Sequence, residues 1–180
     1  FQPGTGTELK GKTLGIQAYG NVGRLVAQLA KGFGMDVLAF DPFVPVDKMV
    51  AEGVTPITDL KELYRRSNYL SLHIPANEQT KKSINYDLLS MMPKGACLVN
   101  TARKEVIHEE DLMRVMEERP DFKYVSDIAP DSLAALQEKF GTRVFATAKK
   151  MGAETAEANV NASLAAANQV VGFLKDGVDR

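Results

Sequence analysis

A short turn near the N-terminus carries the residues with the clearest chemical potential. The segment AYGNVG, residues 18–23, lies between an apolar run and a helical pattern. Gly20 would let the backbone approach a phosphate, and Gly23 would let the following helix pack closely on the preceding strand. The start of such a helix offers unpaired N–H groups and the positive end of its dipole to an anion. The turn therefore indicates a dinucleotide pyrophosphate site, although alanine replaces the first glycine of G-x-G-x-x-G and a plain strand-to-helix turn is the alternative.

An acid follows the next apolar run. Asp41 lies about 20 residues beyond the turn, where a carboxylate can accept from both hydroxyls of an adenosine ribose. An acid there also repels a 2′-phosphate, so it favours NAD over NADP. The alternative is that Asp41 is only a turn residue before Pro42.

Short apolar runs alternate with helical patterns along the chain. Residues 22–33 place Val22, Leu25, Val26, Leu29 and Phe33 on one helical stripe, and residues 60–64, 88–92 and 112–116 repeat that spacing. Alternation of strand and helix predicts a doubly wound α/β (Rossmann) fold with a parallel sheet and crossover helices on both faces. The predicted strands cover residues 13–18, 37–40, 69–74, 96–99, 122–125 and, as a possible sixth, 144–146.

Residues 154–175 predict a long C-terminal helix with one apolar stripe, ended by Asp176 and Gly177. Residues 1–180 are expected to form one dinucleotide-binding domain. Because the chain begins with Phe1 rather than methionine, we expect it to be part of a longer protein.

The composition excludes several classes of protein. Lysine and arginine number 22 against 23 acids, so the chain lacks the basic excess typical of nucleic-acid binding. A single cysteine, Cys97, excludes an internal disulfide and a multi-cysteine metal site, so no metal is expected and a reducing, cytoplasmic location is favoured. No apolar run approaches the roughly 18 residues that would cross a membrane.

Five stretches make the sequence resemble the D-isomer-specific 2-hydroxyacid dehydrogenases, most closely their phosphoglycerate dehydrogenase branch. They are ELKGKTLGI (8–16), the turn at 18–23, LHIP (72–75), LVNTAR (98–103) and MGAETAEA (151–158). In that family the cofactor domain is inserted into a substrate domain. The resemblance implies that this chain is the inserted domain, with the substrate domain mostly absent and the last helix similar to the family's interdomain helix.

The resemblance implies a role for each matching residue. Backbone N–H groups of Asn21 and Val22 would bind the pyrophosphate, and Asp127 would accept from the nicotinamide carboxamide. His73, Ile74 and Pro75, with Thr80 nearby, would line the adenosine side, and Thr101 and Ala102 would lie under the nicotinamide. The full cofactor-binding set is Tyr19, Gly20, Asn21, Val22, Gly23, Asp41, His73, Ile74, Pro75, Thr80, Thr101, Ala102 and Asp127.

Arg103 is implied to bind the carboxylate and carbonyl oxygen of a small 2-oxo acid. A planar, permanently charged guanidinium suits that task. A surface ion pair with an acid such as Glu105 is the alternative.

The sequence departs from the family at the acid/base pair. The family uses a histidine paired with a glutamate, and the histidine position aligns with Lys150. His73 belongs to the adenosine loop, and His108 lies where a helix is expected to start. The glutamate is absent from residues 128–132, where Asp131 is out of alignment by about a residue and receives no catalytic role.

Two explanations follow from this departure. In the first, Lys150 transfers the proton, its amine shifted toward neutrality by burial and by the charges of Lys149 and Arg103. The resemblance then implies NAD-dependent oxidation of D-3-phosphoglycerate to 3-phosphohydroxypyruvate in serine biosynthesis, with reduction of hydroxypyruvate or glyoxylate as the alternative. In the second, the domain is a catalytically retired, NAD(H)-responsive binding module. The isolated chain is expected to be inactive, and the family implies a homodimer through the cofactor domain.

Overall fold

The computed structural model describes residues 6–147 and 155–176. The described residues fall into two units, 6–147 and 155–176, which are treated separately below. The first unit holds the sheet and the helices that connect its strands. The second is a single helix.

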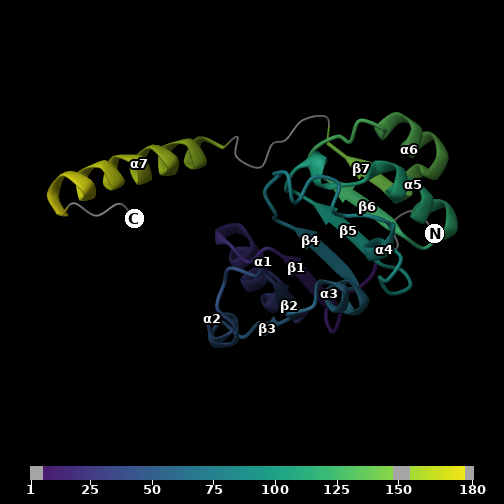
Figure 1. Ribbon diagram of the computed structural model, residues 1–180, viewed down its shortest axis with the longest axis horizontal. Coiled ribbons are helices and arrows are strands. Elements are labelled where there is room, and N and C mark those ends of the chain that lie inside the picture. The colour runs from purple at the N-terminus through teal and green to yellow at the C-terminus, as the bar shows by residue number, and fades with distance from the viewer. Residues whose placement is uncertain (1–5, 148–154, 177–180) are drawn as a thin grey trace. The chain divides into compact units, whose positions relative to one another are not determined.

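A seven-stranded sheet with every pair parallel forms the centre of the first unit (Figure 1). Its strand order is β3-β2-β1-β4-β5-β6-β7, so the chain winds outward in one direction from β1 and in the other from β4. The strands are β1 (Thr13–Gln17), β2 (Asp36–Phe40), β3 (Thr55–Pro56), β4 (Tyr69–Leu72), β5 (Cys97–Asn100), β6 (Lys123–Ser126) and β7 (Val144–Ala146). In this arrangement ligands bind at the point where the winding reverses, beyond the carboxyl ends of the strands.

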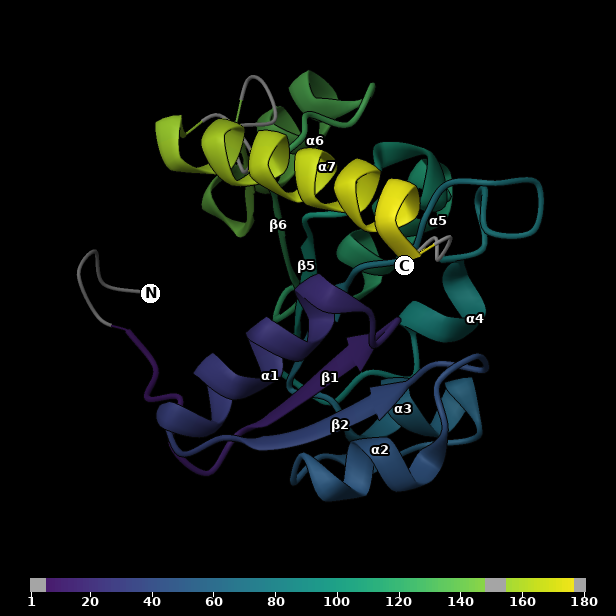
Figure 2. The same ribbon diagram turned by 90° about the vertical axis from the view of Figure 1, so that its left-hand side faces the viewer.

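Helices cover both faces of the sheet (Figures 1 and 2). Alternate residues of β2 show the two cores, since Val37 and Ala39 belong to one hydrophobic cluster and Leu38 to the other. The helices of this unit are α1 (Asn21–Gly32), α2 (Val46–Ala51), α3 (Leu60–Arg66), α4 (Tyr86–Leu89), α5 (Glu109–Glu118) and α6 (Leu133–Phe140), with 3₁₀ turns η1 (Lys104–Val106) and η2 (Gly141–Arg143). The predicted Rossmann-type fold is confirmed.

All six apolar runs predicted as strands contain a strand. The run at 69–74 ends earlier than predicted, because β4 stops at Leu72. Strand β3 was not predicted. It has only two residues, one of them Pro56, which lacks the backbone N–H of a typical strand residue.

Helix α1 does not pack on the sheet through its apolar stripe. Its buried residues are Gly23, Ala27 and Ala30. Of the predicted stripe, Val26 is partly buried against the core, and the other four side chains are exposed. A Cβ on Gly23 would lie 2.4 Å from the carbonyl oxygen of Ala18, so only glycine fits there. The small residues let the helix approach closely. The exposed large side chains on α1 are Val22, Leu25, Leu29 and Phe33.

The second unit is helix α7 (Ala156–Asp176), which confirms the predicted long C-terminal helix. The side chain of Thr155 accepts a hydrogen bond from the backbone N–H of Ala158 at 3.0 Å, so the helix begins with a polar cap. Within the described residues, no helix combines the length and hydropathy needed to cross a membrane.

Candidate functional site

Parallel register brings most of the predicted site residues to one edge of the sheet. The last residues of five neighbouring strands pair in a row: Phe40, Gln17, Leu72, Asn100 and Ser126. The segments that follow these positions therefore leave the sheet side by side. They carry Asp41, the turn at 18–23, the loop from His73, the turn at 101–103 and Asp127.

The glycine-containing turn leads directly into α1. Gly20 is the N-cap residue of the helix in an extended conformation, and no side chain caps the first turn. Its free N–H groups are available to an anion. Ala18 has a φ of 76°, a conformation that suits glycine, and it occupies the place of the missing first glycine. Alanine thus keeps the shape of the turn at a conformational cost of about 1–3 kcal/mol.

The carboxylate of Asp41 is fixed by two backbone groups. Oδ2 accepts a hydrogen bond from the N–H of Tyr19 at 2.8 Å, and Oδ1 accepts one from the N–H of Phe43 at 2.8 Å. The contact with Phe43 is the turn role that was the alternative for this residue. The contact with Tyr19 joins the acid to the glycine-containing turn of residues 18–23. Each carboxylate oxygen can accept a further hydrogen bond, so both oxygens keep a lone pair for a hydroxyl donor.

A buried tyrosine connects this turn to α2. The hydroxyl of Tyr19 donates to Glu52 Oε2 at 2.7 Å, and Arg24 donates to both oxygens of the same carboxylate. Burial, followed by the hydrogen bond to Glu52, raises the pKa of Tyr19 to about 12. The hydrogen bonds from Arg24 and Tyr19 lower the pKa of Glu52. Sequence reasoning missed Glu52, because nothing in its local sequence pointed to a partner more than 30 positions away.

The loop after β4 begins at His73. Its backbone N–H donates to the carbonyl of Gln17 at 2.9 Å, and its Nε2 lies 2.9 Å from the hydroxyl of Ser71. Ile74 is buried. These contacts fix the start of the loop against β1, beside the turn of residues 18–23.

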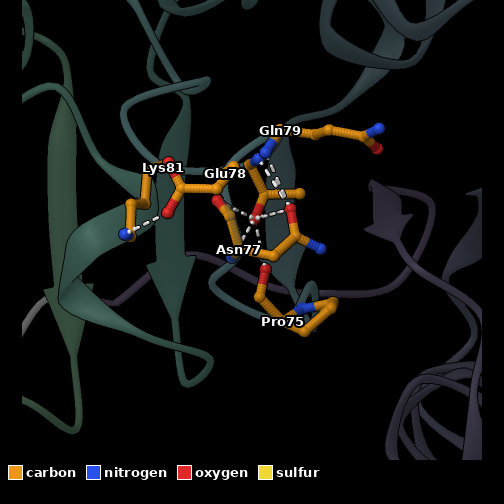
Figure 3. Close-up of polar contacts among 6 residues, drawn as sticks. Pro75, Asn77, Glu78, Gln79 and Lys81 are labelled. Carbon is orange, nitrogen blue, oxygen red and sulfur yellow. Dashed lines mark hydrogen bonds and ion pairs between the residues drawn. The ribbon is translucent and has the colours of Figure 1, made fainter.

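Thr80 closes the same loop, whose residues Pro75, Asn77 and Gln79 are labelled in Figure 3. Its hydroxyl donates to the carbonyl of Pro75 at 2.5 Å and accepts from the N–H of Asn77 at 2.9 Å. Asn77 Oδ1 accepts from the backbone N–H of Gln79 at 2.9 Å. Thr80 therefore shapes the loop that carries Pro75.

The turn that follows β5 is built around a buried asparagine. The Asn100 Oδ1 accepts from the N–H of Ala102 at 3.0 Å, and its Nδ2 donates to the carbonyl of Arg103 at 3.0 Å. The Arg103 side chain is exposed and donates to the carbonyl of Ala102 at 3.1 Å. Among the described residues it forms no ion pair, with Glu105 or any other acid. Thr101 is half-buried in this turn.

Asp127 follows β6 and has an unusual side chain. Its Oδ1 is buried and has no hydrogen-bond donor among the described residues. Buried polar atoms are rarely left without a partner, because the loss of hydration costs about 1–3 kcal/mol. An unpaired carboxylate oxygen at this edge points to a donor from a bound molecule. The hydroxyl of Thr147 donates to the Asp127 carbonyl at 2.7 Å and joins β7 to this position.

The proposed acid/base Lys150 lies outside the described residues, as do Lys149 and residues 151–154 of the MGAETAEA stretch. His108 is the N-cap of α5 and accepts from the N–H of Asp111 at 3.4 Å, which confirms its predicted helix-start role. Asp131 is exposed and pairs with Lys104 at 2.5 Å, so it is engaged in a surface ion pair.

A cavity of about 490 Å³ lies elsewhere and contains none of the predicted site residues. Its charged lining is of mixed sign and includes the ion pair between Lys104 and Asp131. Its geometry therefore adds nothing to the site at the strand ends. The cavity is lined by Lys81, Lys82, Lys104, Glu105, Ile107, His108, Glu109, Glu110 and Asp131.

Comparison with known proteins identifies the class of this domain. The chain belongs to the D-isomer-specific 2-hydroxyacid dehydrogenase family, because the model of that family's NAD-binding domain matches residues 2–140. The resemblance recognised from the sequence motifs is confirmed. Residues 2–140 are thus an NAD-binding domain of this family.

Individual relatives narrow the comparison. The chain is 31% identical over 176 residues to D-3-phosphoglycerate dehydrogenase of Methanocaldococcus jannaschii, a match that covers 94% of this chain and 32% of the relative. It is 43% identical over 107 residues to hydroxypyruvate reductase of Thermotoga maritima, covering 59% of this chain and 34% of that protein. NAD⁺-bound 3-phosphoglycerate dehydrogenase of Entamoeba histolytica matches with a TM-score of 0.87 and 42% identity, over 98% of this chain and 56% of that one. The chain spans about a third of the length of the curated relatives.

Proposed function

We propose that the full-length protein is an NAD-dependent 2-hydroxyacid dehydrogenase. The observation that carries this proposal is the position of Arg103 and Asp127. They follow the ends of adjacent strands, β5 and β6, at the edge where the phosphate turn also lies. Arg103 supplies a permanent cation for the carboxylate of a 2-hydroxy acid. Asp127 supplies a buried acceptor, unpaired among the described residues, for the amide of a nicotinamide.

The residues present fit NAD. The uncapped N-terminus of α1 would hold the pyrophosphate, Asp41 the ribose, and Asp127 Oδ1 the carboxamide. A Cβ on Gly20 would meet no atom within 4 Å, so there is open space in front of the turn. When bound, NAD accepts the hydride that leaves the alcohol carbon of the substrate.

Arg103 would orient the substrate by binding its carboxylate and the oxygen that becomes the carbonyl. Oxidation also needs a base for the hydroxyl proton, and reduction needs an acid for the new alkoxide. Lys150 aligns with the family's histidine, and an amine can act in both ways. Replacing Lys150 with alanine in the full-length protein should abolish turnover while NADH binding persists. Unchanged turnover would remove Lys150 as the acid/base.

We propose D-3-phosphoglycerate as the substrate, oxidised to 3-phosphohydroxypyruvate in serine biosynthesis. Support comes from relatives named D-3-phosphoglycerate dehydrogenase that match 92–94% of this chain. The second candidate is reduction of hydroxypyruvate or glyoxylate, supported by two reductase relatives at 43% and 37% identity over shorter stretches.

Steady-state reduction of 3-phosphohydroxypyruvate, hydroxypyruvate and glyoxylate with NADH would distinguish these substrates. We expect the highest kcat/KM with the phosphorylated acid. A higher value with either of the other two would favour the reductase alternative. No turnover with any of them, together with NADH binding, would favour the retired binding module. In that module, however, the exposed Arg103, which forms no ion pair among the described residues, would have no evident purpose.

We further propose that the protein is a cytoplasmic homodimer that associates through this domain. The exposed stripe of Val22, Leu25, Leu29 and Phe33 on α1 supports association, since a large apolar patch is unfavourable in water. Light scattering of the chain should give twice the monomer mass. A monomer at micromolar concentration would contradict the dimer.

A further inference from the structure

Asn100 is a fully buried polar residue at the end of β5, immediately before the turn that carries Arg103. Its side-chain amide is used on both sides. Oδ1 accepts from the N–H of Ala102 at 3.0 Å, and Nδ2 donates to the carbonyl of Arg103 at 3.0 Å. Through these two bonds a single side chain holds the backbone of residues 102 and 103. The position from which the Arg103 side chain extends is therefore fixed.

The same residue also contacts the neighbouring strand. The backbone carbonyl oxygen of Asn100 accepts a hydrogen bond from the hydroxyl of Ser126 at 2.9 Å and one from the backbone N–H of Asp127 at 3.3 Å. Its Nδ2 lies 3.4 Å from the hydroxyl of Tyr124 on β6. Asn100 thus bonds to the Arg103 carbonyl through its side chain and to the Asp127 N–H through its own backbone carbonyl.

We propose that Asn100 is a positioning residue for the reaction: it fixes the 2-oxo acid end of the site, at Arg103, relative to the nicotinamide end, at Asp127. This inference rests on the proposed function of those two residues. Hydride transfer depends on the relative placement of the two reacting molecules, and small errors in that placement reduce the rate strongly. A buried clamp shared by both ends would hold it without touching substrate or cofactor.

The contacts explain why asparagine is required at this position. The Ala102 N–H needs an acceptor and the Arg103 carbonyl needs a donor, and a primary amide supplies both from one short side chain. Aspartate would keep the acceptor for the Ala102 N–H. Its second carboxylate oxygen would face the Arg103 carbonyl oxygen, and these two acceptors repel each other. Alanine would leave both backbone groups without these bonds in the buried turn.

The kinetic test uses Asn100→Asp in the full-length protein. We expect kcat/KM for the 2-oxo acid to fall about tenfold or more, because the partly buried carbonyl of Arg103 loses its donor, while the dissociation constant for NADH changes by less than about threefold. Tyr124→Phe is the matched control. It removes the hydroxyl that contacts Asn100 at 3.4 Å and the Ser126 side chain, and it leaves the Asn100 bonds to Ala102 and Arg103 in place, so both constants should stay near those of the wild type. Equal losses of NADH affinity and kcat/KM in Asn100→Asp would overturn the proposal.

A double-mutant cycle with Arg103→Ala separates positioning from a general structural role. If Asn100 acts through Arg103, Asn100→Asp should lower kcat/KM less than about twofold further once the arginine is absent. A full, multiplicative loss in that background would contradict the proposal.

Hydrogen exchange tests the clamp without turnover, so it remains informative even if the proposed function fails. In Asn100→Ala, the amide of Ala102 should exchange about tenfold faster or more, with Leu70 on β4 unchanged as the internal reference. Equal acceleration at both amides would indicate general destabilisation and overturn the proposal, as would unchanged exchange at Ala102. If Asn100→Ala does not fold, Asn100→Asp serves instead: Ala102 should remain protected because its acceptor is kept, and loss of that protection would contradict the clamp.

Discussion

The carboxylate of Asp41 accepts a hydrogen bond from the backbone N–H of Tyr19 at 2.8 Å, so the acid that follows β2 is bonded directly to the turn of residues 18–23 that follows β1. The two features were separate in the sequence. Their connection means that a change at Asp41 affects the shape of the turn as well as the group offered to a ribose.

Replacing Asp41 with alanine should narrow the preference for NAD over NADP, because the carboxylate that repels a 2′-phosphate is removed. NAD affinity should also fall about tenfold, since a charged hydrogen-bond partner is lost. Calorimetric titration with both cofactors measures the two effects. Asp36→Ala is the control: Asp36 is exposed at the opposite end of β2 and should leave both affinities unchanged. An unaltered NAD to NADP ratio would show that Asp41 is only a turn residue.

The two glycines of the turn should respond differently to alanine. At Gly23 a Cβ would lie 2.4 Å from the Ala18 carbonyl oxygen, so Gly23→Ala should cost about 3 kcal/mol of unfolding free energy. At Gly20 a Cβ meets nothing within 4 Å, so Gly20→Ala should fold normally but bind NADH more weakly. Denaturant unfolding and fluorescence titration provide the measurements. Similar stability losses in the two variants would contradict this account of the turn.

Six of the seven strands, all except β3, and their alternation with helices could be predicted because they depend on local pattern. Apolar runs such as residues 69–74 are typical of strands buried on both faces. The packing face of α1 could not be predicted in the same way. Four of the five side chains of its predicted apolar stripe are exposed, and the fully buried positions are Gly23, Ala27 and Ala30, because close approach to the sheet favours small residues over the most apolar ones.

The site residues could be located by their order after each strand, but their partners could not. Glu52 contacts Tyr19, which lies 33 positions away, and no spacing rule reveals that pair. The Asn100 bonds to Ala102 and Arg103 are local, as in an Asx turn, but its contact with Ser126 on the neighbouring strand depends on the fold. The buried, unpaired oxygen of Asp127 is likewise visible only in the folded chain.

Removing the Asp127 side chain should separate binding from stability. Asp127→Ala should weaken NADH binding about tenfold, yet it should not lower the unfolding free energy without cofactor. Oδ1 has no donor to lose among the described residues, and its removal should raise that free energy by up to about 1–3 kcal/mol, since the buried oxygen no longer has to be desolvated. Fluorescence titration and denaturant unfolding measure the two quantities.

Asp121→Ala provides the matched control for that comparison. Burial alone would raise the pKa of Asp121, but hydrogen bonds from the Gly95 N–H and the Arg119 guanidinium lower it. Its removal should therefore cost about 1–3 kcal/mol of stability without affecting NADH. If Asp127→Ala destabilised the protein as much as Asp121→Ala and left NADH binding intact, Asp127 would be structural.

Cys97 should make stability fall at alkaline pH. Burial raises the pKa of its thiol from 9.0 to about 11, so the native state favours the neutral form. Its contribution is complete below pH 9 and is lost as the pH rises from 9 to 11, because the unfolded chain ionises first. Between pH 8 and 10.5 the wild type should lose about 2 kcal/mol more than Cys97→Ala. Parallel pH profiles for the two proteins would contradict this prediction.

The central claim is that the carboxyl edge of this sheet binds NAD, and a titration of the chain followed by backbone amide NMR tests it most directly. We predict saturable shifts concentrated at the turn of residues 18–23, at Asp41 and at Asp127, with residues at the opposite edge, such as Asp36, unaffected. Saturable binding that leaves those amides unchanged, or no binding of NAD at millimolar concentration, would contradict the account.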